Sequence, residues 1–283
     1  MLSIARPHHL AVLPSGYGRL FDDAVAVLSA DDRVRALWVH GSVGRGDADA
    51  SSDLDLLLAV SDAHFDEFWS GWRTWLSAIS PTVLARPVPW VPGILYAVTP
   101  DCLRIDIAAE RVGAVPSSGF TNRAVVFDRD GLDGQVPAPA APPGPDRSRV
   151  ETAIEEPLRY LGLLPAMLHR EAFLLVQEGY VHLRRRLVEL FQEATAPHAT
   201  VGAKHGRFQI TDDQYGLLEA LPWPQADRGE LIAAHRVIGS QLLHVAPPIA
   251  TLVGLPWPEE LERAVRRHLR RELAIELDAP PLM

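Results

Sequence analysis

Two aspartates in an apolar stretch carry the first chemical signal of this sequence. Asp53 and Asp55 belong to Ser52–Val60 (SDLDLLLAV), which alternates at first and then becomes fully apolar, as a central strand does. Side chains alternate between the faces of a strand, so both carboxylates should point to one side. Neighbouring carboxylates repel each other unless a cation lies between them. Because Mg²⁺ is typically held by one or two carboxylates together with substrate phosphates, the pattern predicts a magnesium site.

A glycine-rich segment, GSVGRG at residues 41–46, precedes these acids and follows the β-prone run Arg35–Val39. Its glycines predict a tight turn in which backbone N–H groups can face an anion. Ser42 adds a hydroxyl and Arg45 a fixed positive charge. A phosphate-binding turn just before metal-binding carboxylates suits a nucleoside triphosphate with Mg²⁺. The alternative is an ordinary hairpin whose acidic side chains bind no metal. An Asp-x-Asp pattern without the glycine-rich segment would favour that alternative.

The stretch His40–Val60 resembles the nucleotidyltransferase superfamily of the DNA polymerase β type, whose signature is Gly-Ser, a short spacer and Asp-x-Asp. Its motif is most similar to those of the bacterial antibiotic nucleotidyltransferases, which act on aminoglycosides or lincosamides, and of the minimal nucleotidyltransferases. The resemblance implies that Asp53 and Asp55 are catalytic metal ligands. It also implies that Gly41, Ser42 and Arg45 bind the nucleotide. The cofactors it implies are an NTP, with ATP favoured, and Mg²⁺, with two ions favoured.

A third acid is expected on the later strand Leu103–Ile107, where Arg104 and Asp106 share one face. A mid-strand acid with apolar neighbours is costly unless it is paired or metal-bound. An ion pair with Arg104 is the structural explanation. The superfamily, however, carries a third carboxylate on a later strand, and the resemblance implies Asp106 as that catalytic metal ligand. Glu110 is the alternative position.

The only lysine, Lys204, lies in a basic loop flanked by glycines, Gly202–Arg207. Its position in the second half of the chain resembles that of a lysine which antibiotic nucleotidyltransferases use to cover the triphosphate. The resemblance therefore implies Lys204 as a further nucleotide-binding residue. Its structural alternative is a solvated loop cation.

The surrounding pattern predicts an α+β fold, in which a small mixed β-sheet domain is followed by an all-helical bundle. Helical spacing of apolar residues predicts one helix over Ser61–Ile79, and Ser148 with Glu151 forms a capping-box pattern at the start of the helical half. The proline-rich run Val136–Asp146 cannot form a helix or a central strand. We therefore predict a nucleotidyltransferase domain at 1–136, a linker at 137–147 and a helical substrate-binding domain at 148–283.

The composition limits the classes of partner that the chain is expected to bind. The chain has 283 residues, one cysteine and a net charge of −9. The acidic balance disfavours a nucleic-acid partner and favours a cationic small molecule. No apolar run approaches the length of a membrane span, and the single cysteine fits a cytoplasmic location. The oligomeric state is left open.

These observations predict an enzyme that transfers NMP, with AMP favoured, from an NTP to a hydroxyl of a small molecule. The resemblance implies an aminoglycoside-type antibiotic as the acceptor. Two alternatives stay open at this point: a toxin-type nucleotidyltransferase that modifies a protein or tRNA, and a non-catalytic nucleotide-binding module.

Overall fold

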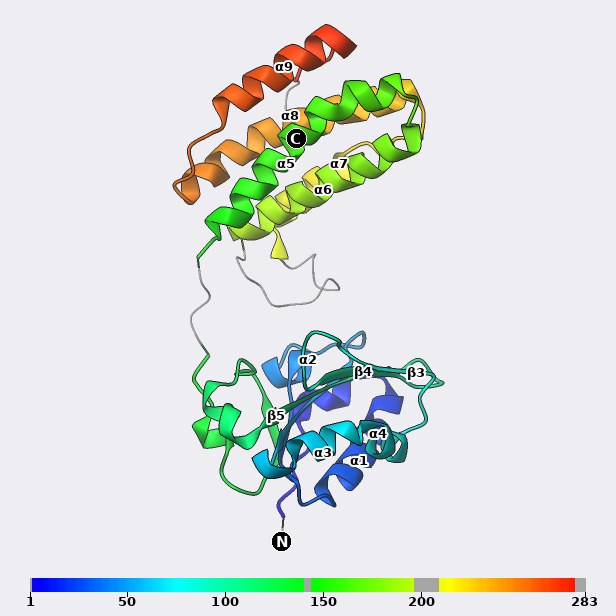
Figure 1. The fold of residues 1–283 in the computed structure, drawn as a ribbon, viewed down its shortest axis with the longest axis vertical. Helices are drawn as coiled ribbons and strands as arrows, with labels where there is room; N and C mark the ends of the chain where they lie inside the picture. The colour runs from blue at the N-terminus through cyan, green and yellow to red at the C-terminus, as the bar shows by residue number, and fades with distance from the viewer. Residues whose placement is uncertain (1, 140–143, 196–208, 278–283) are drawn as a thin grey trace. The chain divides into compact units, whose positions relative to one another are not determined.

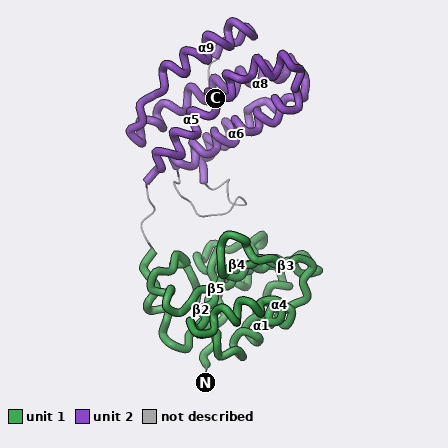
Figure 2. The backbone as a smooth tube through the Cα atoms, in the orientation of Figure 1, with its two compact units in different colours: residues 1–140 green, residues 141–283 purple. Residues whose placement is uncertain are grey.

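Strands and helices gather in the first half of the chain, and helices alone follow in the second half (Figure 1). The computed structural model describes residues 2–139, 144–195 and 209–277. The chain divides into two units, unit 1 at residues 1–140 and unit 2 at 141–283 (Figure 2). The predicted α+β class, a small mixed sheet followed by a helical region, is confirmed. The functions assigned to the two domains remain predictions.

Unit 1 contains one sheet, with the strand order β3-β4-β5-β2-β1-β6. Its strands are β1 (Val34–Val39), β2 (Leu54–Val60), β3 (Leu84–Pro87), β4 (Ile94–Val98), β5 (Arg104–Arg111) and β6 (Ala124–Asp128). The pair β2 and β5 is parallel, and the other neighbours are antiparallel. The strand β2 is central because its residues are apolar and buried on both faces, except for Asp55.

Helices cover one face of this sheet. They are α1 (Ser15–Ser29), α3 (Phe65–Ser70) and α4 (Trp72–Ile79), whose apolar residues join one buried cluster with alternate residues of the strands. The single helix predicted over Ser61–Ile79 is wrong in detail, since α3 and α4 are separate. Gly71 lies between them with ψ near 11°, outside helical geometry, and glycine loses the most backbone freedom when it is held in a helix.

The opposite face is covered only in part. Two 3₁₀ turns, η3 (Val112–Ser117) and η4 (Asp133–Gln135), and the segments beside them place Val115 and Leu132 against this face. The buried cluster there takes its strand residues from β1, β2 and the middle of β5. The remaining short elements of unit 1 are η1 (His8–Val12), η2 (Asp62–His64) and α2 (Gly41–Arg45).

Unit 2 is helical throughout its described residues. Its helices are α5 (Arg147–His169), α6 (Phe173–Thr195), α7 (Asp212–Ala220), α8 (Arg228–Leu252) and α9 (Glu259–Leu273). Helix α5 packs against α6, α8 and α9, and all five contribute to one buried cluster. The predicted cap at Ser148 is corrected: the N-cap of α5 is Asp146, two residues earlier, and its side chain accepts the Ser148 and Arg149 N–H groups. Among the described helices of the chain, none is long and apolar enough to cross a membrane.

Candidate active site

Half of one sheet face is left uncovered by the described residues of unit 1. The helix layer covers the other face, and the segments around η3 and η4 cover only the half near β1. Because side chains alternate along each strand, the register fixes which residues reach the open half. These residues are half-buried or exposed, and they are Asp55, Arg104, Asp106, Tyr96, Leu84 and Arg86.

Asp55 and Asp106 lie side by side on this open half. They are register partners on the parallel strands β2 and β5. Neighbouring strands are about 4.8 Å apart and register partners share a face, so both carboxylates face the same space. Each is half-buried. A carboxylate pair of this kind favours a divalent cation, because the two negative charges otherwise repel each other.

Asp53 lies one residue before β2, which begins at Leu54 rather than at the predicted Ser52. Its Oδ2 is 3.1 Å from Nη2 of Arg104, and its side chain is 15% exposed. In the sequence, Arg104 was the candidate partner of Asp106; in the structure it forms an ion pair with Asp53. Asp53 therefore belongs to the same region as Asp55, with an arginine already bound to it.

The predicted glycine-rich turn folds as the short helix α2, which Gly46 ends in a left-handed conformation at φ 84°. Gly41 has φ 60°, and a Cβ atom there would overlap the carboxylate of Asp55 and lie 2.7 Å from its Cγ. The backbone N–H of His40 donates to the carbonyl oxygen of Asp55 at 3.0 Å. The two halves of the motif thus meet, and only glycine at position 41 leaves room for the Asp55 carboxylate.

The other predicted nucleotide-binding residues differ in their surroundings. Ser42 is buried, and its carbonyl oxygen accepts the N–H groups of Gly46 and Asp47, both at 3.0 Å. Arg45 is one-quarter exposed and forms an ion pair with Asp47 at 3.2 Å. Lys204 lies outside the described residues.

His40 is a residue of this site that the sequence analysis did not select. Burial, with a smaller contribution from the charge of Arg45, lowers the pKa of His40 to about 4, so the ring is neutral at pH 7. The ring packs edge-to-face on Phe120 at a centroid distance of 5.0 Å. Its buried Nε2 has no hydrogen-bond partner among the residues that the structure describes. The position of His40 directly before Gly41-Ser42 is the sequence feature that could have identified it.

Glu110, the alternative third acid, occupies the opposite end of β5. It pairs in register with Ala59, four residues and therefore about 13 Å along the strand from Asp106. Its Oε1 lies 3.4 Å from Nη1 of Arg123, and burial raises the pKa of its carboxyl group. Arg123 also stacks over the Trp38 ring at 3.9 Å. These contacts assign Glu110 to the packing around Arg123.

Two of the three predicted acids, Asp55 and Asp106, are placed to bind a divalent ion. Together with Asp53 they do not form a complete set of three ligands. Among the described residues, no three His, Cys, Asp or Glu side chains form a group arranged for a metal. Asp55 and Asp106 supply hard oxygen ligands on one face, as Mg²⁺ requires. The space that a Cβ at Gly41 would fill leaves the Asp55 carboxylate unobstructed by the turn. Asp53 would become a further ligand if its carboxylate released Arg104 and bound the metal ion instead.

No protein-family model and no curated protein matches the chain. Solved structures do match it. An aminoglycoside 6-adenyltransferase from Bacillus subtilis is 11% identical over 89% of this chain and 95% of its own, with a TM-score of 0.43. The CdnE cyclic dinucleotide synthase of Elizabethkingia meningoseptica is 11% identical over 90% of this chain and 91% of its own, with a TM-score of 0.28.

A CCA-adding enzyme is 15% identical over 89% of this chain and 68% of its own, with a TM-score of 0.33. All three TM-scores are below 0.5. Values this low do not establish a substrate or a mechanism.

Proposed function

We propose that unit 1 is a nucleotidyltransferase catalytic unit, which transfers a nucleoside monophosphate from an NTP to a hydroxyl group of an acceptor. One observation carries the proposal: Asp55 and Asp106 are register partners on an open sheet face, with the backbone of Gly41 against the Asp55 carboxylate. This arrangement joins two hard oxygen ligands to the glycine-rich segment that is proposed to receive the phosphates.

The proposed step is a displacement at the α-phosphorus. The acceptor hydroxyl oxygen forms a bond to this phosphorus, and the bond to the bridging oxygen of pyrophosphate breaks with its electron pair on pyrophosphate. Asp106 receives the hydroxyl proton. Asp55, Asp106 and Asp53 would hold Mg²⁺, which supplies neutralisation of phosphate charge and orientation of the reacting oxygens when it is bound.

The glycine-rich segment is proposed to bind the triphosphate. Ser42 and the backbone at Gly41 would hold the phosphates, and Arg45 would stabilise the leaving pyrophosphate by exchanging its contact with Asp47. The assignment of Lys204 to the triphosphate remains the prediction made from the sequence. ATP is the favoured donor. The resemblance implies an aminoglycoside-type acceptor and hence a role in antibiotic resistance, whereas the residues beside the acids favour an acceptor of another chemistry.

A transfer assay tests this proposal. The full chain is incubated with each of the four α-labelled NTPs, Mg²⁺ and a panel of aminoglycosides, lincosamides, aromatic acids, nucleoside monophosphates and tRNA. We expect labelled product and equal release of pyrophosphate with at least one acceptor, both of which require metal. We expect Asp55→Asn to remove activity and Glu110→Gln, the matched acid in the Arg123 contacts, to retain it. Binding of NTP by the wild-type protein without transfer to any acceptor would favour the binding module instead.

A further inference from the structure

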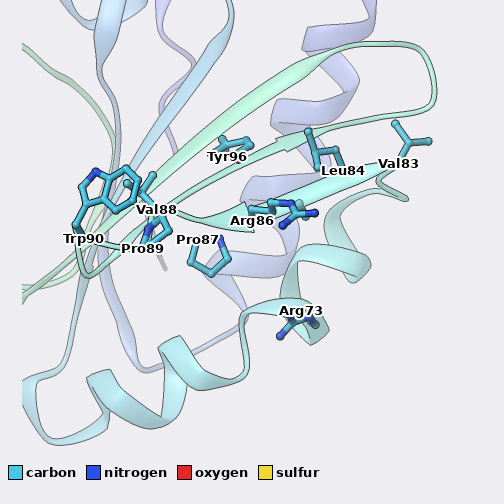
Figure 3. A pocket seen from close by; sticks show the side chains of 10 residues that line it. Arg73, Val83, Leu84, Arg86, Pro87, Val88, Pro89, Trp90 and Tyr96 are labelled. Atoms are coloured by element: carbon cyan, nitrogen blue, oxygen red, sulfur yellow. The ribbon is translucent and has the colours of Figure 1, made fainter.

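A hollow lies along the edge of the sheet at β3. Its volume is about 780 Å³, and it follows β3, the loop after it and the facing part of β4 and α4 (Figure 3). Arg86 and Leu84 extend from β3, Tyr96 lies behind them on β4, and Arg73 reaches the hollow from α4 (Figure 3). All of these residues belong to unit 1.

Strand register connects this hollow directly to the acids. Asp106 pairs with Asp55 on one side and with Tyr96 on the other, and Tyr96 pairs with Arg86. Register partners share a sheet face, so these residues form one row across four strands. At about 4.8 Å per strand, the Tyr96 backbone is one spacing from Asp106, and the Arg86 backbone is two spacings, or about 10 Å, away. Arg73 borders the hollow from the face that α4 covers, whereas Arg86 and Tyr96 border it on the face of the acids. A molecule that occupies the part beside Arg86 and Tyr96 can therefore extend to the carboxylate pair.

The charge of the hollow is positive. The described residues that line it include Arg73 and Arg86 and no carboxylate. Most arginines of unit 1 are held by acids. Arg86 and Arg73 form no ion pair with any residue in the described part of the chain, and the Arg73 guanidinium lies over the Trp72 ring at 4.3 Å. An uncompensated guanidinium group can bind a carboxylate or phosphate through paired, charge-assisted hydrogen bonds.

Two aromatic side chains line the same space. Trp90 is 82% exposed and Tyr96 is 38% exposed. The loop that carries Trp90 is fixed at its two ends, because Val88 N–H donates to Ile94 O at 2.8 Å and Ala109 N–H donates to Gly93 O at 2.6 Å. Because the loop is anchored, the solvent-exposed indole ring of Trp90 presents a flat surface on which an aromatic ring can stack.

We propose that this hollow is the acceptor subsite and that it takes an acceptor bearing both a planar aromatic ring and an anionic group, a phosphate or a carboxylate. The anion binds Arg86, the ring stacks on Trp90 or Tyr96, and the reacting hydroxyl group lies at Asp106. The inference rests on the proposed function for its reaction: the hydroxyl oxygen displaces pyrophosphate from the α-phosphorus and gives its proton to Asp106. Local charge decides here despite the net charge of −9, because distant surface charges are screened beyond about 8–10 Å.

Binding of defined probes tests the subsite separately from catalysis. The donor site of the full chain is first filled with a non-hydrolysable NTP analogue and Mg²⁺, and this binding is itself measured. Guanosine monophosphate and 3-(4-hydroxyphenyl)propanoate are then titrated, to distinguish a phosphate from a carboxylate source. Guanosine and 4-hydroxyphenethyl alcohol serve as their uncharged counterparts, and kanamycin serves as the polycation.

We expect at least one anionic probe to bind more tightly than its uncharged counterpart. Arg86→Gln should weaken that probe about 10-fold and leave the uncharged counterpart unchanged, since the lost interaction is a charged hydrogen bond. Trp90→Ala should weaken both about 10-fold by removing the stacking surface. Arg19→Gln, at an exposed arginine of α1, and Trp223→Ala, at an exposed tryptophan of unit 2, are the matched controls and should have no effect.

The outcomes separate the two proposals. The subsite proposal is overturned if neither anionic probe binds, or if binding is unchanged by both Arg86→Gln and Trp90→Ala. It is also overturned if kanamycin binds more tightly than the anionic probes and Arg86→Gln strengthens kanamycin binding. If the probes bind as expected while the NTP analogue does not bind, the proposed function fails and the anionic subsite stands. If the analogue binds and transfer occurs to acceptors without ring or anion, the subsite fails and the proposed function stands.

Discussion

At the scale of single residues, the site depends on which side chains the strand register brings together. Asp106 lies between Asp55 and Tyr96, whereas Glu110, on the same strand and face, is held by Arg123. Substitutions of Asp106 and of Glu110 can therefore be compared to test which acid acts in the reaction. Only Asp106 is close enough to Asp55 to share a metal ion or receive a proton at the proposed reacting centre.

We predict that Asp106→Asn lowers the single-turnover rate by about 10²–10⁴-fold, the usual loss when general-base help is removed. The NTP analogue should still bind, because the lost interaction acts mainly in the transition state. Glu110→Gln should keep the rate within a few-fold of wild type and lower the melting temperature by breaking its contact with Arg123. A fast Asp106→Asn protein would remove Asp106 from the chemistry.

Gly41 provides a second prediction at this scale. Gly41→Ala would force a side chain into the position of the Asp55 carboxylate and would also carry the backbone cost of φ 60°. Gly131→Ala is its control, since Gly131 has φ 70° and nothing within 4 Å of a Cβ atom. The backbone cost alone is roughly 1–2 kcal/mol. We expect Gly131→Ala to lose only that stability and Gly41→Ala to lose transfer activity as well. Equal activity of the two variants would show that displacement of Asp55 is harmless.

At the scale of elements, a helix crossing in unit 2 depends on one missing side chain. Gly179 of α6 faces Tyr160 of α5, and a Cβ atom at Gly179 would coincide with the tyrosine hydroxyl group. That hydroxyl group donates to the Leu175 carbonyl at 3.3 Å. The two helices can therefore approach closely only at a glycine.

We predict that Gly179→Ala destabilises the protein by about 1–3 kcal/mol, the usual cost of an overpacked core position, because Tyr160 must move. Gly216→Ala in α7 should instead be neutral or stabilise by about 0.5–1 kcal/mol, since nothing lies within 4 Å and alanine favours helix. Urea unfolding followed by circular dichroism measures both. A stable Gly179→Ala protein would mean that the α5–α6 crossing adapts at no cost.

The helix α8 adds a pH dependence. His235 is fully buried, its Nδ1–H donates to the Leu231 carbonyl at 2.7 Å, and burial lowers the pKa of its ring to about 4. Between about pH 6.5 and pH 4 the unfolded chain binds a proton that the folded chain does not, so stability falls as pH falls. We predict a loss of roughly 2 kcal/mol between pH 7 and pH 5 from this group. His235→Gln should reduce that loss, whereas the exposed His169→Gln should not.

The sequence allowed prediction of the elements better than of the site. Apolar runs predicted the strands β1, β2 and β5 and the helical second half, because these signals are local. The helix break at Gly71 and the cap at Asp146 depended on one residue each and were missed. Asp106 was selected with the help of a family resemblance. Tyr96 and Arg86 could not be, since they join the acids only through strand register, which no local pattern specifies.

At the scale of the whole molecule, the two units have separate buried cores. The clusters of unit 1 take their members from Leu10 to Leu132, and the cluster of unit 2 takes its members from Val150 to Leu277. A chain of about 140 residues buries enough surface to fold by itself. The division at residues 140 and 141 falls within the proline-rich segment, which cannot continue a helix or a central strand.

We therefore predict that residues 1–140 and 141–283 fold as separate polypeptides, each with a cooperative unfolding transition and with circular dichroism spectra that add up to that of the full chain. The control is a division at 100/101, between β4 and β5, which separates strands of one buried cluster and should leave the shorter piece unfolded. Unit 1 alone should bind the NTP analogue, because Gly41, Asp55 and Asp106 all belong to it. Aggregation of either unit, or cooperative folding of both control pieces, would show that the cores are not the independent units that their members indicate.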